Sequence, residues 1–428
     1  MQPNKFNITK EEILEYHLGG KIGLNILKSL SNQRDLSIAY TPGVAAICEE
    51  IHNDEEKAYS LTSKGNLVAV VTDGTAVLGL GNIGPKASIP VMEGKAILFK
   101  TFADVDAWPV PLEGVINPAT ERTDIQKLVE TTSRLSCMYG GINLEDIAGP
   151  ECFDVEDQLQ EMLDIPVFHD DQWGTAIITL AALKNYCVIT GKNIKNLSIV
   201  INGAGAAGLR IADMIKTEGG TKIMICDSKG ILTVNRNDLN LHKKKHAVST
   251  GLKTLADAMK NADVFIGVSV ADCVTGEMVE TMSEYPAIFA MANPVPEIMP
   301  EIVEKAMKGR KYIMATGRSD YPNQINNVLG FPFIFRGALD VRAKRITMGM
   351  KIAASSALAE LARIGNVPEK VKKAYNRDFT FGPDYLIPTP FDPRIKEWES
   401  KRVALTAIKE GVARLKEVPE YNSRTNEK

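Results

Sequence analysis

Cysteine is scarce in this 428-residue chain, and no two of its six cysteines stand at the C-x-x-C spacing. Without such pairs the sequence predicts neither a zinc knuckle nor a disulfide framework, which favours a reducing compartment. Long apolar runs are also lacking, because no stretch reaches the ~18 residues of a membrane span. The first 18 residues contain no apolar core of a signal peptide. We therefore expect a cytoplasmic protein without a membrane partner.

A strong charge of one sign is missing as well, since the net charge is −3 and the pI is about 6.1. This balance excludes a general attraction to nucleic acid or to anionic membranes. Histidine is rare, with five residues in the chain. Acid–base chemistry is therefore expected from lysine and tyrosine side chains.

A glycine-rich run at residues 203–208 is the most informative feature that the sequence does contain. It follows an apolar segment, residues 197–201, and opens a helix-like segment, residues 208–219. Between a strand and a helix, a G-x-G-x-x-G run lets the backbone approach a pyrophosphate at the helix N-terminus. The predicted dinucleotide loop consists of Gly203, Ala204, Gly205, Ala206, Ala207 and Gly208. The alternative is a glycine-rich turn that serves close packing and binds no ligand.

The choice between NAD and NADP depends on the residues after the next apolar segment, residues 222–226. That segment ends at Asp227, near the ~20-residue distance expected for a ribose-binding acid. A carboxylate there binds the ribose hydroxyls and repels a 2′-phosphate, which favours NAD. Lys229, two residues later, carries a positive charge and weakens this preference. The basic cluster at residues 242–246 is interpreted as a solvated loop or helix end, with a position near a cofactor phosphate as the alternative. NAD is therefore slightly favoured over NADP.

Strand-like and helix-like segments alternate after the glycine-rich run. Strands are expected at residues 264–269, 287–293 and 312–316, separated by helices such as 255–262 and 302–307. This alternation indicates a parallel sheet with helices on both faces. We therefore predict an α/β fold with two domains, of which the C-terminal one is a Rossmann-like, doubly wound and mostly parallel sheet.

The two domains are expected over residues 1–165 and 166–428. The first is expected to hold the catalytic groups and to contain a strand at 67–72 and a helix at 89–103. The second is expected to bind the dinucleotide and to end in helices such as residues 401–416.

Lys95 interrupts an apolar face of the helix predicted over residues 89–103. Val91, Leu98 and Phe102 lie on that face at helical spacing. Burial penalises an ammonium and lowers the pKa of a lysine, which suits a base near neutral pH. The alternative is a lysine whose stem packs while its ammonium reaches water.

Adjacent acidic residues occur twice between apolar neighbours, as Glu145-Asp146 and as Asp170-Asp171. Both pairs precede a predicted buried helix at residues 175–190. Burying adjacent carboxylates is costly unless a charge neutralises them, and a hard divalent cation bound through oxygen is a common solution. The pairs therefore favour Mg²⁺ or Mn²⁺. For any one aspartate, an N-cap or a solvated turn is the alternative.

Five segments, in this order, resemble the short bacterial-type malic enzymes over most of the chain, from about residue 35 to about residue 390. They are Tyr40-Thr41-Pro42-Gly43-Val44-Ala45, Glu93-Gly94-Lys95-Ala96, Leu144-Glu145-Asp146, His169-Asp170-Asp171-Gln172-Trp173-Gly174-Thr175-Ala176, and Asn326-Asn327-Val328 with Phe335-Arg336-Gly337-Ala338-Leu339-Asp340. The resemblance implies oxidative decarboxylation of L-malate to pyruvate and CO₂. It also implies reduction of NAD or NADP and a requirement for Mg²⁺ or Mn²⁺.

The resemblance also assigns roles to individual residues. Lys95 is the implied base, Tyr40 is the implied acid, and Asp170 supports them. Asn293 and Asn327 match the substrate-contacting asparagines of the family, and Asn293 is expected at the cofactor as well. The implied metal ligands are Glu145, Asp146 and Asp171. Before the resemblance is considered, Tyr40 is expected to pack against a helix that Thr41 caps and Pro42 begins.

Two other functions share part of this pattern. A malolactic enzyme has the same architecture but keeps its NADH and releases lactate. A catalytically silent dinucleotide-binding protein would retain the glycine-rich loop without needing Lys95, Tyr40 or the three carboxylates. A homodimer is expected, because dimers are the commonest closed assembly and suit this family.

Overall fold

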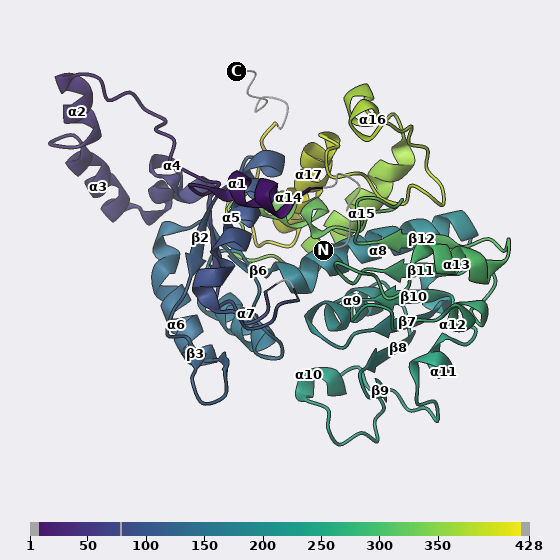
Figure 1. The fold of residues 1–428 in the computed structure, drawn as a ribbon. Helices are drawn as coiled ribbons and strands as arrows, with labels where there is room; N and C mark the ends of the chain where they lie inside the picture. The colour runs from purple at the N-terminus through teal and green to yellow at the C-terminus, as the bar shows by residue number, and fades with distance from the viewer. Residues whose placement is uncertain (1–7, 78, 421–428) are drawn as a thin grey trace.

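The computed structural model describes residues 8–77 and 79–420. A parallel sheet and a mostly parallel sheet, formed by successive parts of the chain, lie side by side in Figure 1. The α/β fold with a Rossmann-like C-terminal sheet is confirmed. Among the described helices, none has the length and apolar character needed to cross a membrane.

The first sheet has four parallel strands in the order β2-β1-β5-β6. Its strands are β1 (Leu67–Thr72), β2 (Asp106–Pro111), β5 (Gly141–Leu144) and β6 (Val167–His169). Its helices are α5 (Gly84–Ala103), α6 (Ile125–Leu135) and α7 (Glu151–Met162), and β3 (Ile116–Asn117) and β4 (Arg122–Thr123) form a small hairpin. Strand β1 is buried almost throughout, as expected for a parallel strand covered on both faces.

The second sheet has the order β12-β11-β10-β7-β8-β9 and is parallel except for β9. Its strands are β7 (Ser198–Asn202), β8 (Lys222–Asp227), β9 (Gly230–Ile231), β10 (Val264–Gly267), β11 (Ala287–Ala290) and β12 (Ile313–Thr316). Its helices are α9 (Ala206–Thr217), α10 (Leu241–Lys244), α11 (Leu255–Met259), α12 (Gly276–Glu280) and α13 (Pro300–Met307). The expected strands are therefore present, although β10 and β11 end earlier than predicted.

Helix α8 (Asp170–Thr190) connects the two sheets and contributes most of its residues to the core. It begins at Asp170 and not at residue 175, so the second acidic pair occupies its first turn. Carboxylates are favourable in that position because the helix dipole is positive at its N-terminus.

Four α-helices follow in the last part of the chain that the structure describes. They are α14 (Phe331–Asp340), α15 (Met348–Ile364), α16 (Glu369–Tyr375) and α17 (Arg394–Lys409). Helix α17 begins and ends seven residues before the predicted 401–416, with Pro393 at its N-cap. Helix α14 returns to the first sheet, where Phe331 and Phe335 contact Phe99 with ring centroids 4.8 and 5.3 Å apart.

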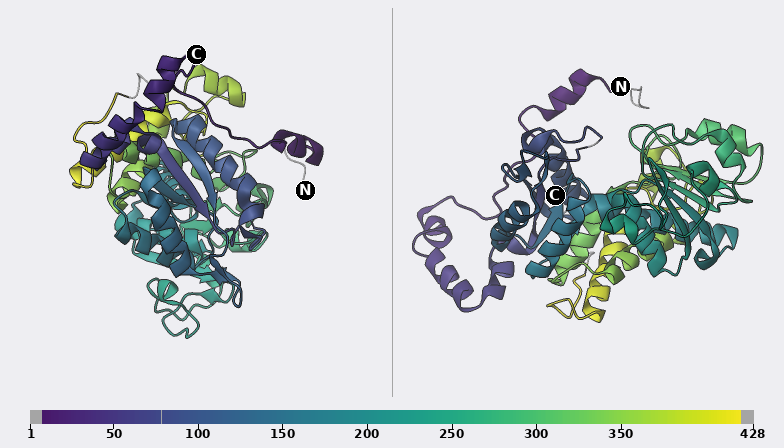
Figure 2. Two further views of the ribbon diagram at one scale, coloured as in Figure 1. Left: turned by 90° about the vertical axis from the view of Figure 1, so that its left-hand side faces the viewer. Right: turned by 90° about the horizontal axis from the view of Figure 1, so that it is seen from below.

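The N-terminal part of the chain is packed very differently. It contains α1 (Lys10–His17), α2 (Gln33–Ala39), α3 (Val44–Asn53) and α4 (Ala58–Leu61), and none of these helices has a buried residue. Figures 1 and 2 show α2 and α3 projecting from the body. The described hydrogen bonds of residues 22–53, here called the arm, stay within residues 22–57.

Candidate active site

Lys95 lies at the centre of a buried ionic cluster on the first sheet. Its ammonium is 2.7 Å from Asp170 Oδ2, 2.8 Å from Glu145 Oε1 and 4.3 Å from the centre of the Phe331 ring. The residue is 6% exposed, so its ammonium does not reach bulk water. The interpretation of Lys95 as a snorkelling surface lysine is therefore wrong.

The charges around Lys95 reverse the expected direction of its pKa shift. Burial alone lowers the pKa of Lys95, but Asp170, Glu145 and Asp171 together raise it above its ordinary value. Burial has the opposite effect on the carboxylates and raises the pKa of Asp170 to about 6, despite the nearby ammonium. The prediction that burial lowers the pKa of Lys95 is therefore wrong, because it did not include the carboxylates that pair with the ammonium.

Three carboxylates beside Lys95 form a cluster with the geometry of a cation site. One oxygen from each of Glu145, Asp146 and Asp171 lies within 4.8 Å of the others. Glu145 and Asp146 directly follow β5, while Asp171 lies in the first turn of α8, directly after β6. Since β5 and β6 are neighbouring parallel strands, their carboxyl ends bring both acidic pairs to one edge of the sheet.

The two predicted substrate asparagines occupy different places. Asn327 follows the second sheet, and its side-chain amide donates a hydrogen bond to Asp170 Oδ2, the oxygen that also binds Lys95. Asn293 follows β11, where its side chain lies against Gly317. Asn327 therefore joins the ionic cluster directly, whereas Asn293 lies in the loop between the second sheet and α13.

Tyr40 is the one predicted catalytic residue that lies outside this cluster. It ends α2 on the arm and is 67% exposed. The expected helix start is also wrong, because α3 begins at Val44 with Gly43 at its N-cap. Within this chain, Tyr40 does not pack beside Lys95.

The predicted dinucleotide loop connects β7 to α9 at the edge of a cavity of about 850 Å³. Gly203 has φ 121°, and a Cβ there would overlap the Val268 carbonyl. A Cβ at Gly208 would overlap the Gly203 carbonyl, so this turn requires both glycines. Part of the loop lines the cavity, with Gly203, Ala204, Gly205 and Ala206, whereas Ala207 and Gly208 continue into α9.

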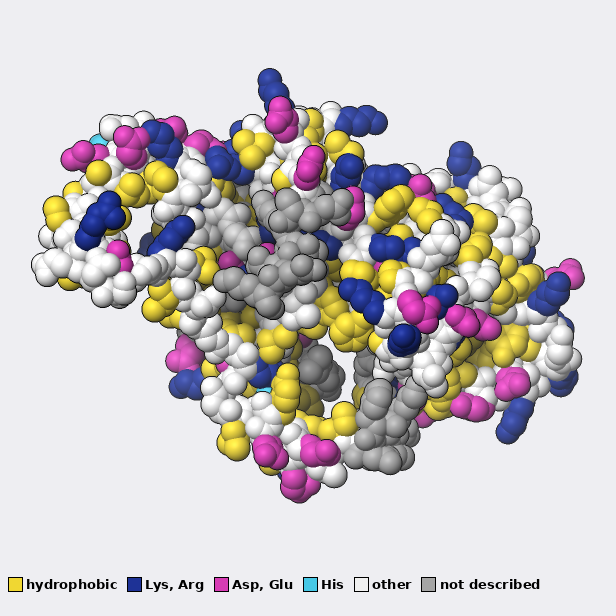
Figure 3. Space-filling view, turned by 90° about the horizontal axis from the view of Figure 1, so that it is seen from above, with side chains coloured by type: hydrophobic (Ala, Val, Ile, Leu, Met, Phe, Trp, Pro, Cys, Tyr) yellow, Lys and Arg dark blue, Asp and Glu magenta, His cyan; other side chains and the backbone are white. Residues whose placement is uncertain are grey.

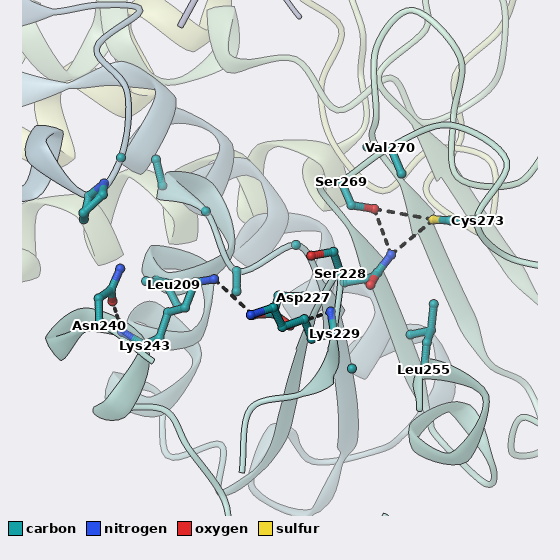
Figure 4. A pocket seen from close by; sticks show the side chains of 18 of the residues that line it. Leu209, Asp227, Ser228, Lys229, Asn240, Lys243, Leu255, Ser269, Val270 and Cys273 are labelled. Carbon is teal, nitrogen blue, oxygen red and sulfur yellow. Dashed lines mark hydrogen bonds and ion pairs between the residues drawn. The ribbon is translucent and has the colours of Figure 1, made fainter. Parts of the chain in front are cut away.

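Asp227 lines the same cavity, but its carboxylate is already bound within the chain (Figure 4). It accepts hydrogen bonds from Arg236 at 2.8 and 2.9 Å, from Lys243 at 3.1 Å and from the backbone of Lys229 at 3.0 Å. Burial acts to raise the pKa of Asp227, but these donors hold it below its ordinary value. The expectation of NAD considered Asp227 and Lys229 alone, whereas in the structure the Asp227 carboxylate is also paired with Arg236 and Lys243.

Sequence reasoning missed the residues that bind Asp227 and those that close the cavity. Arg236 belongs to no recognisable motif. Lys243 was expected near the cofactor only in the alternative interpretation of the basic cluster at residues 242–246. Ser269 and Cys273 line the opposite part of the cavity, from the loop after β10. A rule that polar residues just beyond parallel strands face the ligand would have found Ser269.

Two family profiles match the chain in succession. The profile "Malic enzyme, N-terminal domain" matches residues 19–160, and "Malic enzyme, NAD binding domain" matches residues 173–372. Together they cover well over half of the sequence.

Individual malic enzymes are similar to this protein over nearly the whole chain. A "Probable NADP-dependent malic enzyme" of Rickettsia prowazekii is 52% identical over 97% of this chain and 53% of its own length. The chain thus spans about half the length of that relative. The "Bifunctional malic/malolactic enzyme" of Bacillus subtilis is 50% identical over 96% of each chain. The crystal structure of malic enzyme from Pyrococcus horikoshii has a TM-score of 0.85 and 42% identity, covering 96% of this chain and 93% of that one. These similarities, together with the fold that surrounds Lys95, show that the chain belongs to the malic enzyme family.

Proposed function

We propose that the protein catalyses the divalent-metal-dependent oxidative decarboxylation of L-malate to pyruvate and CO₂ with reduction of NAD(P)⁺. The observation that carries this proposal is the buried Lys95 ammonium beside the cluster of Glu145, Asp146 and Asp171. Oxidation at C2 of malate needs a base and an electrophile at the same carbon, and this cluster offers both. The loop between β7 and α9 provides the binding site for the hydride acceptor.

Glu145, Asp146 and Asp171 are the residues that would hold Mg²⁺ or Mn²⁺. They fit such a cation because hard divalent ions prefer carboxylate oxygens, and the three side chains converge within 4.8 Å. When bound, the cation supplies Lewis-acid stabilisation of negative charge on the substrate oxygen. Its charge also offsets the repulsion among buried carboxylates.

In the proposed reaction, Lys95 takes the proton of the C2 hydroxyl. Its ammonium must first lose a proton, a loss that Asp170 and Glu145 oppose. Glu145 is also a proposed metal ligand, so sharing its charge with a cation weakens its effect on the pKa of Lys95. Asp170 and Asn327 then orient the amine toward the substrate, and Asn293 binds malate beside the coenzyme.

We further propose that Tyr40 acts in the active site of a second copy, within a homodimer. Apolar side chains are exposed along the arm, including Leu24 at 89%, Ile26 at 81% and Leu27 at 80%. Figure 3 shows hydrophobic side chains on the surface of this projecting segment. Clustered exposed apolar residues mark contact surfaces, and two-fold dimers are the commonest closed assembly. In the partner's site, Tyr40 would protonate C3 of the enolate that remains after CO₂ leaves.

For the coenzyme, we propose that NADP is used at least as well as NAD. Arg236 and Lys243 neutralise Asp227, and Lys253 adds a positive charge to the lining of the cavity. Lys229 also lines the cavity, where its ammonium is paired with Asp238 at 2.9 Å. Lys243→Ala is expected to raise the KM for NADP about tenfold, the effect of losing one charge-assisted hydrogen bond, and to change the KM for NAD much less. Lys244→Ala is the control, because Lys244 is exposed and does not line the cavity. Equal changes for the two coenzymes would contradict the proposal.

The activity is tested by incubating the protein with L-malate and Mn²⁺, separately with NAD and NADP. Reduced coenzyme, pyruvate and lactate are measured in the same sample. Reduced coenzyme equal to pyruvate is the expected result. Lactate without net reduction would indicate a malolactic enzyme, and the absence of product would favour a silent dinucleotide-binding protein.

We also propose a cytoplasmic location, which is supported by the composition of the sequence, and a division of the chain into two domains. The division into residues 1–165 and 166–428 is supported by the two profile matches, which leave residues 161–172 between them.

A further inference from the structure

We infer that Glu297 is a positioning residue that fixes the coenzyme side of the cleft to the substrate side. It lies in the loop between β11 and α13, residues 291–299, here called the β11 loop. Its carboxylate reaches the loop between β10 and α12, residues 268–275, here called the β10 loop. The β11 loop carries Asn293, and the β10 loop lines the coenzyme cavity. The assignment of substrate and coenzyme to these loops rests on the proposed function.

The Glu297 carboxylate binds both loops at once. Its Oε1 accepts hydrogen bonds from the backbone N–H of Ser269 at 2.8 Å and from the Ser269 hydroxyl at 3.2 Å. Its Oε2 accepts from the backbone N–H of Ala292 at 3.0 Å. Ala292 directly precedes Asn293, so one carboxylate sets the separation of the two loops.

The backbone around Glu297 reinforces the same connection. The Glu297 carbonyl accepts a hydrogen bond from Val274 at 3.0 Å, and the Pro296 carbonyl accepts one from Asp272 at 3.2 Å. Gly267 ends β10 directly against the carboxyl group, and a Cβ there would overlap it. The β10 loop is therefore held at its start by the side chain and near its end by the backbone.

The network continues from Glu297 into the coenzyme cavity. The Ser269 hydroxyl, which donates to Glu297, accepts a hydrogen bond from the Asn202 amide at 2.8 Å. Asn202 ends β7, directly before the dinucleotide loop, and also donates to Cys273 at 3.2 Å. Figure 4 shows Ser269 and Cys273 turned toward one another in the cavity wall. A continuous series of hydrogen bonds thus joins the dinucleotide loop to the residue before Asn293.

The chemistry of the site requires a carboxylate. All three groups that reach Glu297 donate hydrogens, and they approach both of its oxygens. A glutamine would direct its NH₂ group at Ser269 or at Ala292, leaving a donor facing a donor. Because Glu297 is 0% exposed, water does not replace the lost acceptor. The side chain points into the protein and not into the cavity, so we assign it positioning and not catalysis.

Glu297→Gln tests this inference through binding as well as turnover. We expect the Kd of NADPH, measured by titration without malate, to rise about tenfold, the effect of a buried donor left unpaired. The KM for malate is expected to rise by a similar factor. Glu399→Gln is the matched control, because Glu399 is also a 0% exposed glutamate but lies on α17, away from the coenzyme cavity. It should leave both quantities at the parental values.

Ser269→Ala distinguishes the effect on the β10 loop from the effect on the β11 loop. It also provides a test if Glu297→Gln does not fold. It removes the hydroxyl that joins Asn202 to Glu297 but leaves the bond from Glu297 to Ala292 in place. We expect a weaker NADPH affinity with the KM for malate almost unchanged. Parental values in a folded Glu297→Gln, or equal changes of both quantities in Ser269→Ala, would overturn the inference. A parent that binds NADPH but does not turn over malate would instead contradict the proposed function, and the NADPH titration would still test the connection to the coenzyme loop.

Discussion

The arm and the body of the molecule use apolar side chains in opposite ways. Strands β1 and β7 bury nearly all of their residues, and α8 is buried over most of its length. Helices α2 and α3 bury none, although the arm carries leucines and isoleucines at a high density. Lys95 belongs to the first region and Tyr40 to the second. Under the proposed function, the base Lys95 is positioned within the chain, whereas the acid Tyr40 would be positioned only by association with a second copy.

The largest expected effect is a loss of turnover when Lys95, in the buried body of the molecule, is replaced. Lys95→Ala should reduce turnover by about 10²–10⁴-fold, the usual effect of removing a general acid or base. NADPH affinity should stay close to the parental value, because Lys95 does not line the coenzyme cavity. Steady-state kinetics and an NADPH titration measure the two effects. Lys100→Ala, an exposed lysine on the same helix, is the control, and retained turnover in Lys95→Ala would remove it from the mechanism.

The next effect concerns the carboxylates that surround Lys95. Asp171→Ala should raise the Mn²⁺ concentration for half-maximal activity by at least about 10–100-fold, or abolish activity. That factor is typical of mutating a residue that only hydrogen-bonds to a metal ligand, and the loss of a ligand itself should cost at least as much. Asp157→Ala is a control, since Asp157 is an exposed acid on the neighbouring α7. A Mn²⁺ titration of the three proteins gives the comparison. An Asp171→Ala protein that responds to Mn²⁺ like the parent would contradict the ligand assignment.

The smallest effect on the folded chain is expected on the arm. Leu24→Asp should leave the free energy of unfolding of the single chain within about 0.5 kcal/mol, because Leu24 contacts no core. It should nevertheless weaken the homodimer, measured by light scattering across a dilution series. Leu405→Asp changes an exposed leucine on α17, outside the arm, and should leave association unchanged. An unchanged dimer in Leu24→Asp would argue against the arm as the interface.

The sequence predicted the periodic elements of the body well. Strand β1 has the predicted bounds, and α9 and β8 lie where the glycine-rich run indicated. Hydrophobic periodicity succeeds here because these segments are buried by their own chain. The start of α8 was missed because Asp170 and Asp171 are polar, although carboxylates commonly occupy a first helical turn.

The site was only partly predictable because its properties depend on contacts distant in sequence. The acidic pairs were expected to bind a cation because both precede one buried helix, but the neighbouring strands β5 and β6 that bring them together were not predicted. The pKa of Lys95 could not be predicted, because it depends on Asp170, 75 positions away. The same holds for Asp227, whose carboxylate is paired with Arg236 and Lys243. Local patterns identify the groups, and the tertiary contacts determine their charge states.

The most direct test of the account is to purify mixed dimers of a Lys95→Ala chain and a Tyr40→Phe chain with two affinity tags. If each site combines Lys95 of one copy with Tyr40 of the other, one site in every mixed dimer keeps both residues. The account predicts about half of the parental turnover per mixed dimer, while each variant alone stays nearly inactive. Mixed dimers as inactive as the two variants would contradict it, because Lys95 and Tyr40 would then act within a single chain.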